Sequence, residues 1–175
     1  MRILAIDPGN TESGYALIDS ATCQPINTGK ISNYDLREMI TAGQFTNVDH
    51  VSIEMVASYG MAVGKEVFET CVWIGRYLEV CLDRFWDVDL VYRRDVKLHH
   101  CHTSKAKDSN ITQALVDRFA SGVPNHGKGS KANPGWFYGF KADIWQAYAL
   151  AVYTADTLTA AVDVPVGAHV REVAS

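Results

Sequence analysis

The sequence lacks long apolar runs, closely spaced cysteines and an excess of positive charge. None of its apolar stretches approaches the roughly 20 residues that a membrane-spanning helix needs. The apolar N-terminal segment runs directly into Asp7 and offers no small-residue cleavage site, so we expect no signal peptide. With 47% hydrophobic and 21% charged residues, the 175-residue chain has the composition of a folded domain, which excludes disordered and collagen-like classes. We therefore expect a cytoplasmic protein without a membrane partner.

The four cysteines are scattered along the chain, at positions 23, 71, 81 and 101. This spacing contains no close pair of the kind that binds zinc or forms a redox motif, and it predicts reduced thiols. A zinc site would have to combine Cys101 with the neighbouring His99, His100 and His102. Because these four residues are crowded and do not form two spaced ligand pairs, the pattern disfavours zinc.

The formal net charge of −4 argues at first sight against nucleic acid, because phosphate-binding proteins usually carry a basic surface. The total hides an asymmetry. Residues 93–141 hold nine Lys and Arg against three Asp, a local charge of +6, whereas the rest of the chain holds seven basic and seventeen acidic residues. A basic stretch of this kind can be an ordinary solvated face. Since it coincides here with expected loops, a local phosphate-binding surface is the alternative.

Hydrophobic periodicity predicts an α/β fold built on a mixed sheet of five strands. Strands are expected at residues 2–7, 14–18, 25–31, 48–54 and 88–92, and helices at 34–42, 65–86, 95–100, 109–120 and 141–158. The first three strands should be antiparallel, and the last two, reached through helical crossovers, should be parallel, with helices on both faces of the sheet. We expect one domain over residues 1–160 and a weakly ordered tail over 161–175. The long loop at 121–139 is of a kind that often carries function.

Three carboxylates stand at the ends of expected elements. Asp7 ends the first strand before the Pro8-Gly9 turn, Glu54 ends the buried fourth strand, and Asp143 opens the last helix. A single acid at such a position is usually a cap or a turn residue. If the two strands are neighbours, however, their acids converge at one edge of the sheet, and converging buried acids need a cation. Oxygen ligands with room for water suit Mg²⁺ or Mn²⁺.

Four stretches, in this order, resemble RuvC-type Holliday junction resolvases of the ribonuclease H-like superfamily, most closely the phage-encoded branch. They are ILAIDPG and SGYA in residues 3–16, VSIE in 51–54, VK and SKAKDSN in 96–110, and KAD and AYALA in 141–151. The resemblance covers the chain to about residue 158. It implies a metal-dependent, structure-selective endonuclease that resolves four-way junctions, and possibly other branched DNA, by paired phosphodiester hydrolysis. A phage-encoded member would work in the cytoplasm of a bacterial host.

The resemblance also implies roles for the acids. Asp7 would bridge two Mg²⁺ or Mn²⁺ ions about 3.5–4 Å apart, Glu54 would hold one of them, and Asp143 would complete the catalytic set. The family commonly has a second acid one turn after the helix acid, and this chain has Gln146 there. The spacing puts Gln146 on the same helix face as Asp143, where its amide oxygen would be a weaker metal ligand. Lys107 is expected to stabilise charge on the scissile phosphate, with Lys105 or an ordinary surface role as alternatives.

Further DNA contacts are expected from two loops and several lysines. In the resembling enzymes the region after Glu54 approaches the junction crossover, so Tyr59 or Met61 would wedge between bases, with packing of the next helix as the alternative. Trp136 and Phe137 in the long loop would stack on bases or, equally, cover the last helix. The lysines expected to bind DNA are Lys65, Lys97, Lys105, Lys107, Lys128 and Lys131.

A four-way junction has near two-fold symmetry, so we expect a homodimer with paired sites. Phe68, Val72, Trp73 and Gly75, on the outer face of helix 65–86, offer spare apolar surface for it, with intramolecular packing as the alternative. Gln146 motivates a different class, a junction-binding protein with weak or no catalysis. Two other enzyme classes compete: a ribonuclease H-like nuclease acting on RNA–DNA hybrids, and a phosphotransferase suggested by the phosphate-loop-like segment 7–11. The chain is too short for the two related domains that such phosphotransferases need.

Overall fold

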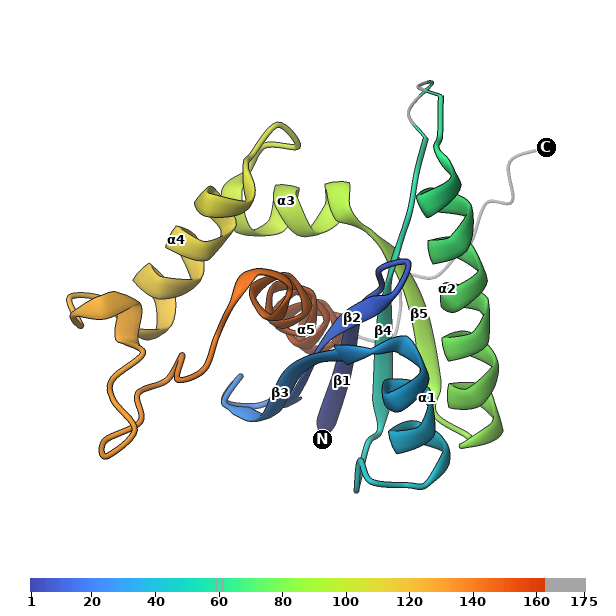
Figure 1. Ribbon diagram of the computed structural model, residues 1–175. Coiled ribbons are helices and arrows are strands. Elements are labelled where there is room, and N and C mark those ends of the chain that lie inside the picture. The colour runs from blue at the N-terminus through green and yellow to red at the C-terminus, as the bar shows by residue number, and fades with distance from the viewer. Residues whose placement is uncertain (59, 61, 163–175) are drawn as a thin grey trace.

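The computed structural model describes residues 1–58, 60 and 62–162, and these form five strands and five α-helices (Figure 1). The strands are β1 (Arg2–Asp7), β2 (Glu12–Asp19), β3 (Pro25–Ser32), β4 (His50–Met55) and β5 (Asp87–Tyr92). The helices are α1 (Asn33–Thr41), α2 (Lys65–Asp83), α3 (Arg93–Cys101), α4 (Asp108–Phe119) and α5 (Ala142–Val162), with a 3₁₀ turn η1 at Asn125–Gly127.

The five strands form one mixed sheet in the order β3-β2-β1-β4-β5. β2 pairs antiparallel with β1 and with β3, and β4 runs parallel to β1 and to β5. Short turns join the first three strands, which therefore pair antiparallel, whereas α1 and α2 supply the crossovers that parallel neighbours require. The predicted sheet of three antiparallel strands followed by parallel ones is confirmed.

Alternate residues of the central strand β1 enter two separate hydrophobic cores. Ile3 and Ala5 pack on one face with α3, α4 and α5, while Leu4 and Ile6 pack on the other face with α1 and α2. All four side chains are fully buried. Because successive side chains of a strand point to opposite faces, a strand that is apolar throughout must be covered on both sides. Figure 1 shows the helices on both faces of the sheet, which confirms the predicted layers.

Helix α5 lies close against the sheet because small residues line the contact. Its Ala147, Ala149 and Ala151 are completely buried. At the start of the helix, a Cβ added to Gly14 of β2 would lie 2.6 Å from the Asp143 carbonyl oxygen, so glycine is required there. The first turn of α5 is thereby held directly against β2.

Two of the aromatic residues of the loop before α5 belong to the core. Phe137 is fully buried, and Trp136 stacks on Phe119 with ring centroids 5.2 Å apart. The indole Nε1 of Trp136 donates a hydrogen bond to the Tyr148 hydroxyl at 2.9 Å. These two residues therefore cover the last helix, which is one of the two predicted alternatives, rather than stacking on bases. Tyr138 is the exposed aromatic residue of this loop.

The cysteines are free thiols, and the histidines near Cys101 have structural partners. His100 donates from Nε2 to the Ala149 carbonyl oxygen at 2.8 Å, and His99 Nε2 lies 2.7 Å from Asp156 Oδ2. Burial lowers the pKa of His100 to about 4, which keeps the imidazole neutral. The described residues contain no group of three His, Cys, Asp or Glu side chains placed to hold a metal, so the zinc alternative has no support.

Two helices end three or more residues away from their predicted ends. Helix α2 ends at Asp83, three residues early, and Phe85 in the turn that follows has a left-handed φ of 59°. Helix α5 continues to Val162, beyond the domain end expected at residue 160. The remainder of the predicted tail lies outside the described residues. No helix in the described part of the chain combines the length and apolarity needed to cross a membrane.

Candidate active site

The structure brings three carboxylates to one end of the sheet. Asp7 is the last residue of β1, and Glu54 takes the neighbouring position on the parallel strand β4. Asp143 lies in the first turn of α5, above Gly14, which is the β2 partner of Asp7. The three acids thus come from elements far apart in the sequence and meet at the same edge, with Asp7 between the other two.

A buried polar network fixes the turn that follows Asp7. The Ser13 hydroxyl donates to Asn33 Oδ1 at 2.6 Å, and Asn33 Nδ2 donates to the Gly9 carbonyl oxygen at 2.9 Å. The Tyr77 hydroxyl of α2 donates to Ser13 Oγ at 3.1 Å, and burial raises its pKa to about 12. Because Ser13, Asn33 and Tyr77 are fully buried, no water replaces a lost bond. The network ties the turn to β2, α1 and α2 and so sets the position of Asp7.

The carboxyl group of Asp7 is strongly perturbed by its surroundings. Burial raises the pKa of Asp7 well above its ordinary value, and the negative charges of Glu54 and Asp143 raise it further, while Arg93 opposes them. A buried carboxyl group between two other acids resists ionisation unless positive charge is supplied. Of the carboxyl groups at this end of the sheet, Asp7 is therefore the one whose ionised form a bound cation would stabilise most.

Glu54 is held by an internal cation, Arg93, the first residue of α3. Arg93 Nη1 donates to both carboxylate oxygens of Glu54, at 2.9 and 3.2 Å, and Nη2 donates to Asp108 Oδ1 at 2.7 Å. The Arg93 and Glu54 side chains are largely buried, at 25% and 13% exposed. Burial raises the pKa of Glu54, and the Arg93 guanidinium works against that shift. Arg93 thus favours the ionised form of Glu54.

Asp143 has a more exposed partner, Lys30 of β3. Lys30 Nζ lies 2.7 Å from Asp143 Oδ2 and 3.4 Å from Glu12 Oε2. The hydrogen bond to Asp143 raises the pKa of Lys30. Two of the three acids are therefore already paired with cations of the same chain.

The donor set fits a divalent ion by its chemistry, although its side chains do not surround one point. Among the described residues, no three potential ligands are placed to share an ion. Asp7, Glu54 and Asp143 supply hard oxygen ligands of the kind that Mg²⁺ and Mn²⁺ prefer. One turn after Asp143, Gln146 is only 8% exposed, and its Oε1 has no hydrogen-bond partner in the structure. A buried carbonyl oxygen without a donor is rare and suits a cation. These residues therefore fit a metal ion once Glu54 and Asp143 are released from their cationic partners.

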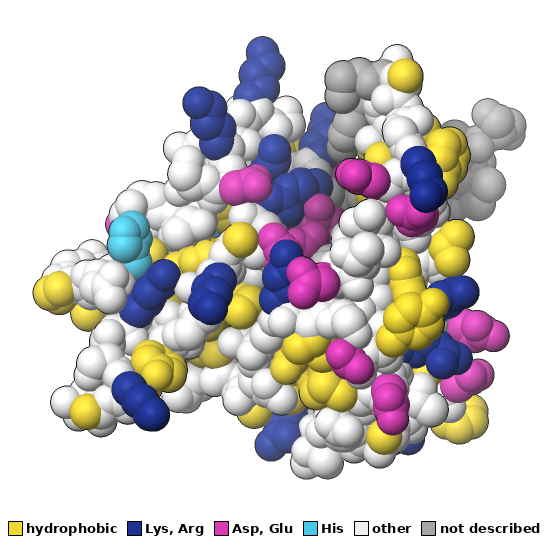
Figure 2. All heavy atoms as spheres, in the orientation of Figure 1, with side chains coloured by type: hydrophobic (Ala, Val, Ile, Leu, Met, Phe, Trp, Pro, Cys, Tyr) yellow, Lys and Arg dark blue, Asp and Glu magenta, His cyan; other side chains and the backbone are white. Residues whose placement is uncertain are grey.

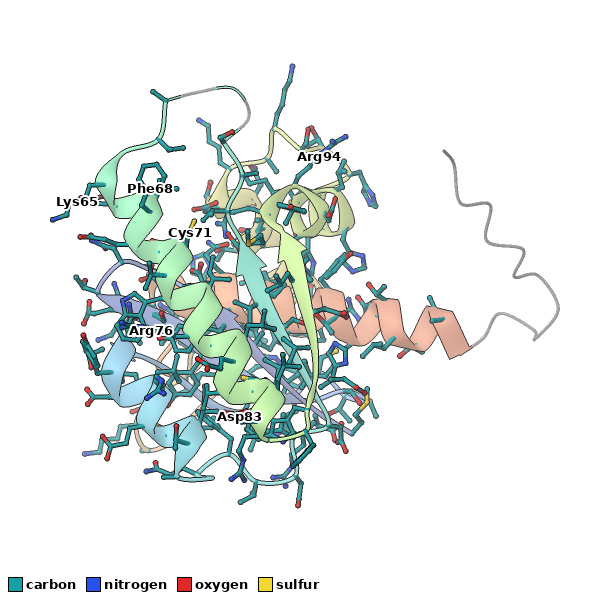
Figure 3. The ribbon with its side chains drawn as sticks, turned by 90° about the vertical axis from the view of Figure 1, so that its right-hand side faces the viewer. Lys65, Phe68, Cys71, Arg76, Asp83 and Arg94 are labelled. Atoms are coloured by element: carbon teal, nitrogen blue, oxygen red, sulfur yellow. The ribbon has the colours of Figure 1, made fainter. Side chains whose placement is uncertain are left out.

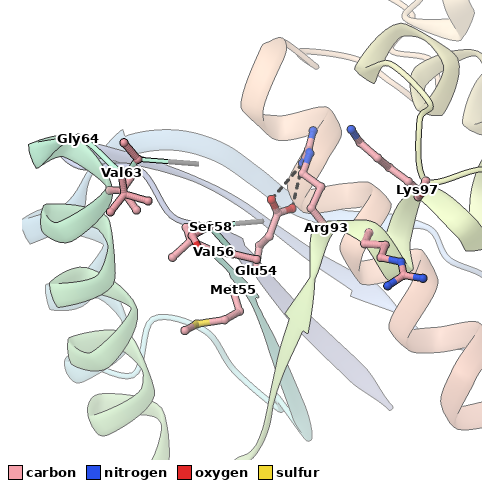
Figure 4. A pocket seen from close by; sticks show the side chains of 13 residues that line it. Glu54, Met55, Val56, Ser58, Val63, Gly64, Arg93 and Lys97 are labelled. Carbon is pink, nitrogen blue, oxygen red and sulfur yellow. Dashed lines mark hydrogen bonds and ion pairs between the residues drawn. The ribbon is translucent and has the colours of Figure 1, made fainter. Parts of the chain in front are cut away.

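A cleft of about 700 Å³ opens beside Glu54. One wall is apolar and comes from the end of β4, the segment after it and the start of α2: Met55, Val56, Val63 and Val67. The other wall is basic and comes from α3: Arg93, Arg94 and Lys97. Figure 4 shows Arg93 joined to Glu54 in this cleft, with Lys97 nearby. A cleft with cations on one wall and apolar side chains on the other suits a nucleic acid, because the cations attract its phosphates and the apolar side chains contact its bases.

The lysines predicted to bind DNA fall in different places. Lys97 lines the cleft. Lys65 is 88% exposed at the start of α2 and pairs with Glu69 at 3.2 Å. The remaining four stand on the segments between helices: Lys105 and Lys107 before α4, and Lys128 and Lys131 before α5. Of the six, the structure places only Lys97 among the described residues of the cleft. The two predicted wedge residues, Tyr59 and Met61, lie outside the described residues.

Acidic side chains lie in the middle of this face, next to a basic region. In Figure 2 the Asp and Glu side chains lie in the middle of the face and toward its lower right, and Lys and Arg side chains project above and to the left of the central acids, on the side of α3 and α4. A polyanion is attracted by these Lys and Arg side chains and repelled by the Asp and Glu side chains. Positive charge at the acids would remove that repulsion.

Comparison with known proteins finds matches among solved structures. No protein-family model and no curated protein matches the chain. A Thermus thermophilus RuvC in complex with a Holliday junction substrate aligns with a TM-score of 0.69 at 12% identity, over 92% of this chain and 96% of its own. A second T. thermophilus RuvC structure aligns with a TM-score of 0.67 at 14% identity, over 92% and 97%. The chain has the RuvC fold.

At such low identity the likeness to RuvC shows the shared fold alone, and it leaves the roles of individual residues to be argued from this site. A Streptomyces griseus ROK family glucokinase aligns with a TM-score of 0.36 over 61% of this chain, too low for a functional comparison. The phage branch of RuvC-type proteins stays a prediction.

Sequence reasoning missed the two internal cations and the buried network. Arg93 directly follows β5, which is parallel to β4, so it had to emerge at the same end of the sheet as Glu54. That signal was available. Lys30 reaches Asp143 because it is paired with Gly14 across β2 and β3, and no local pattern gives that register. The same holds for the contact between Asn33 and the turn at Gly9.

Proposed function

We propose that this protein is a metal-dependent, structure-selective DNA endonuclease that resolves four-way junctions and other branched DNA by paired hydrolysis. The observation that carries the proposal is the convergence of Asp7, Glu54 and Asp143 at one end of a RuvC-type sheet, beside a cleft with a basic wall. The likeness to a RuvC bound to a Holliday junction supports the substrate class.

The chain supplies positioning and charge for this reaction. Two bound Mg²⁺ or Mn²⁺ ions would supply an activated water and stabilise the leaving oxygen. Asp7, which lies between the other two acids, would be the shared ligand; Glu54 and Asp143 would be carboxylate ligands, and Gln146 a neutral one. The two lysines considered for the phosphate, Lys105 and Lys107, both stand before α4 and are not among the described cleft residues, whereas Lys97 lines the cleft.

A homodimer would give the paired cuts that a two-fold symmetric junction requires. Figure 3 shows the outer side of α2, where Phe68 is one of the exposed residues. Phe68, Val72 and Gly75 repeat at helical spacing there; the two side chains are 61% and 53% exposed, and a Cβ at Gly75 would meet no neighbour. Trp73 does not belong to this surface: it is buried, with Tyr34 edge-on to its ring at 4.8 Å.

A junction-binding protein with little catalysis is the second candidate. Two observations favour it: Gln146 stands where an acid would strengthen metal binding, and the acids on either side of Asp7 are neutralised internally. Such a protein would bind branched DNA through the basic wall alone.

Incision of a synthetic four-way junction in Mg²⁺ or Mn²⁺ decides between these functions. The wild type should give paired incisions, and Asp7→Asn should slow them by at least about 10³-fold, since several kcal/mol of charge stabilisation is lost. Asp83→Asn, the same chemical change at the exposed end of α2, is the control and should cleave normally. Tight binding without incision would establish the binding protein. A panel of flaps, forks and RNA–DNA hybrids completes the assay, and equal or better hybrid cleavage would contradict the resolvase proposal.

A further inference from the structure

Arg93 satisfies two carboxylates that belong to different elements. One end of its guanidinium holds both oxygens of Glu54 on β4, and the other end holds Asp108 at the start of α4. The contact to Glu54 is largely buried, whereas the Asp108 side chain is 60% exposed. Charge-assisted bonds such as the one to Glu54 are among the stronger polar contacts of a protein. Arg93, which itself lines the cleft, therefore links a catalytic candidate to the start of α4 at the place where DNA would enter.

A divalent ion and this guanidinium compete for the same oxygens. An ion bound by Glu54 would face the positive charge of Arg93 across the carboxylate, and like charges at such separations repel strongly where water is scarce. The contact between Arg93 Nη2 and Asp108 does not involve Glu54, so it can persist while Nη1 leaves. The side chain then remains tethered in the cleft that it lines together with Arg94 and Lys97.

We propose that Arg93 is an exchangeable counter-ion of Glu54: a divalent ion displaces it, and the freed guanidinium, still tethered to Asp108, binds a phosphate of the DNA in the cleft. Arg93 is thus a positioning residue toward the metal and a binding residue toward the DNA. This inference rests on the proposed nuclease function. Because the same exchange links the two ligands, metal should strengthen DNA binding through Arg93, and DNA should strengthen metal binding to an equal degree.

The ion pair of Lys30 and Asp143, on the other side of the site, is an internal reference for the cost of displacing a counter-ion. Lys30 and Asp143 are 40% and 36% exposed, and a single ammonium group makes the contact. Exposed pairs of this kind contribute little, because water replaces the contact when it breaks. Displacing Lys30 should therefore cost a metal ion less than displacing Arg93.

The first experiment is a titration of metal-free, DNA-free protein with MnCl₂, followed by calorimetry. Arg93→Gln should bind Mn²⁺ about tenfold more tightly than the wild type, since loss of one charge-assisted contact is worth roughly 1.4 kcal/mol or more. Lys30→Gln should change the affinity by about threefold or less. Arg94→Gln removes the same charge from the same cleft without a contact to Glu54, and it too should stay within about threefold.

A gain in metal affinity is a readout that structural damage does not produce, because a damaged site binds more weakly. Equal or weaker Mn²⁺ binding by Arg93→Gln would overturn the inference, as would the absence of Mn²⁺ binding in all variants. An equal gain in Arg94→Gln would also overturn it, because general charge removal would then explain the result.

The second experiment measures the salt dependence of junction binding with and without CaCl₂. Ca²⁺ should make the plot of log K for junction binding against log salt concentration steeper in the wild type than in Arg93→Gln. The difference should correspond to about one additional phosphate contact. Equal steepening in both proteins would overturn the transfer of Arg93 to phosphate. The tests also separate the two proposals. If Arg93→Gln binds Mn²⁺ more tightly but the wild type does not cut junctions, only the nuclease proposal fails. If the wild type cuts junctions but Arg93→Gln binds Mn²⁺ with unchanged affinity, only the counter-ion proposal fails.

Discussion

The acidic end of the sheet and the basic flank around α3 and α4 are built in opposite ways. Asp7 ends the central strand β1, Glu54 is the penultimate residue of its neighbour β4, and the turn after Asp7 is locked by fully buried side chains. Most cations of the flank stand on helix surfaces or on segments between helices, as Lys105 and Lys107 do. The fold thus fixes the positions of the proposed metal ligands Asp7 and Glu54, and it places Lys105 and Lys107, which we propose as DNA contacts, on the exposed surface.

The two regions also differ in their effect on stability. Charges on the exposed flank are hydrated and cost the fold little. At the sheet end Asp7 is desolvated and is repelled by the charges of Glu54 and Asp143, so without a cation its ionised form destabilises the fold. The net charge of −4 averages over both regions and describes neither.

Breaking the network that fixes the acidic end should have the largest effect on stability. Asn33→Ala removes a fully buried amide, which takes away the acceptor of the Ser13 hydroxyl and the donor to the Gly9 carbonyl, so we expect a loss of about 2–4 kcal/mol. Urea denaturation of the metal-free protein measures it. Arg37→Ala, at an exposed position of the same helix, is the control and should stay within about 0.5 kcal/mol. Similar losses in both variants would show that the turn is not held by this network.

Gln146 tests whether the acidic end is built for a cation at the expense of stability. Gln146→Leu replaces an unpartnered buried oxygen by apolar atoms of similar size, so the metal-free protein should gain about 1–2 kcal/mol. The same variant should bind Mn²⁺ several-fold more weakly, since a ligand is lost. Denaturation and MnCl₂ titration check the two effects. A clear loss of stability together with unchanged Mn²⁺ affinity would mean that Gln146 is a structural residue.

Asp7 should show the same opposition between stability and function, with a pH dependence of definite sign. Its pKa is raised in the folded state, so the folded protein binds this proton more tightly than the unfolded chain. Stability therefore falls as pH rises from the ordinary pKa of an aspartate through the raised value, and stays low above it. Asp7→Asn removes this dependence. At pH 8 the metal-free variant should be more stable than the wild type by about 1 kcal/mol or more, and the difference should vanish near pH 4.

Denaturation curves from pH 4 to pH 8 measure the Asp7 effect. A variant that is less stable than the wild type across this range would contradict the idea that repulsion among the acids destabilises the sheet end. Adding MgCl₂ should stabilise the wild type and not the variant, because only an ion bound to the folded state shifts the equilibrium.

The predictable part of this molecule is the part encoded in local patterns. The apolar runs of β1 and β4, each closing on an acid, gave the strand ends, and the spacing of the antiparallel and crossover segments gave the sheet. Trp73 shows the limit of such patterns. The helical spacing of α2 predicts it on the outer face, but in the structure Tyr34 of α1 packs against its ring and it is buried. Cross-strand register and side-chain reach decide the rest, as in the contacts made by Lys30 and Arg93.

The basic flank gives the smallest predicted effect and the sharpest test of where the DNA runs. Lys97 lines the cleft beside Glu54, whereas Lys128 stands on the loop before α5 and is not among the described cleft residues. Lys97→Ala should weaken junction binding about three- to fivefold and reduce the salt slope by about one. Lys128→Ala, the same change in the same basic stretch, should alter affinity less than about twofold. Equal effects would mean that DNA crosses the loop as well as the cleft, and the basic stretch would then act as one surface, with every cation of residues 93–141 contributing alike.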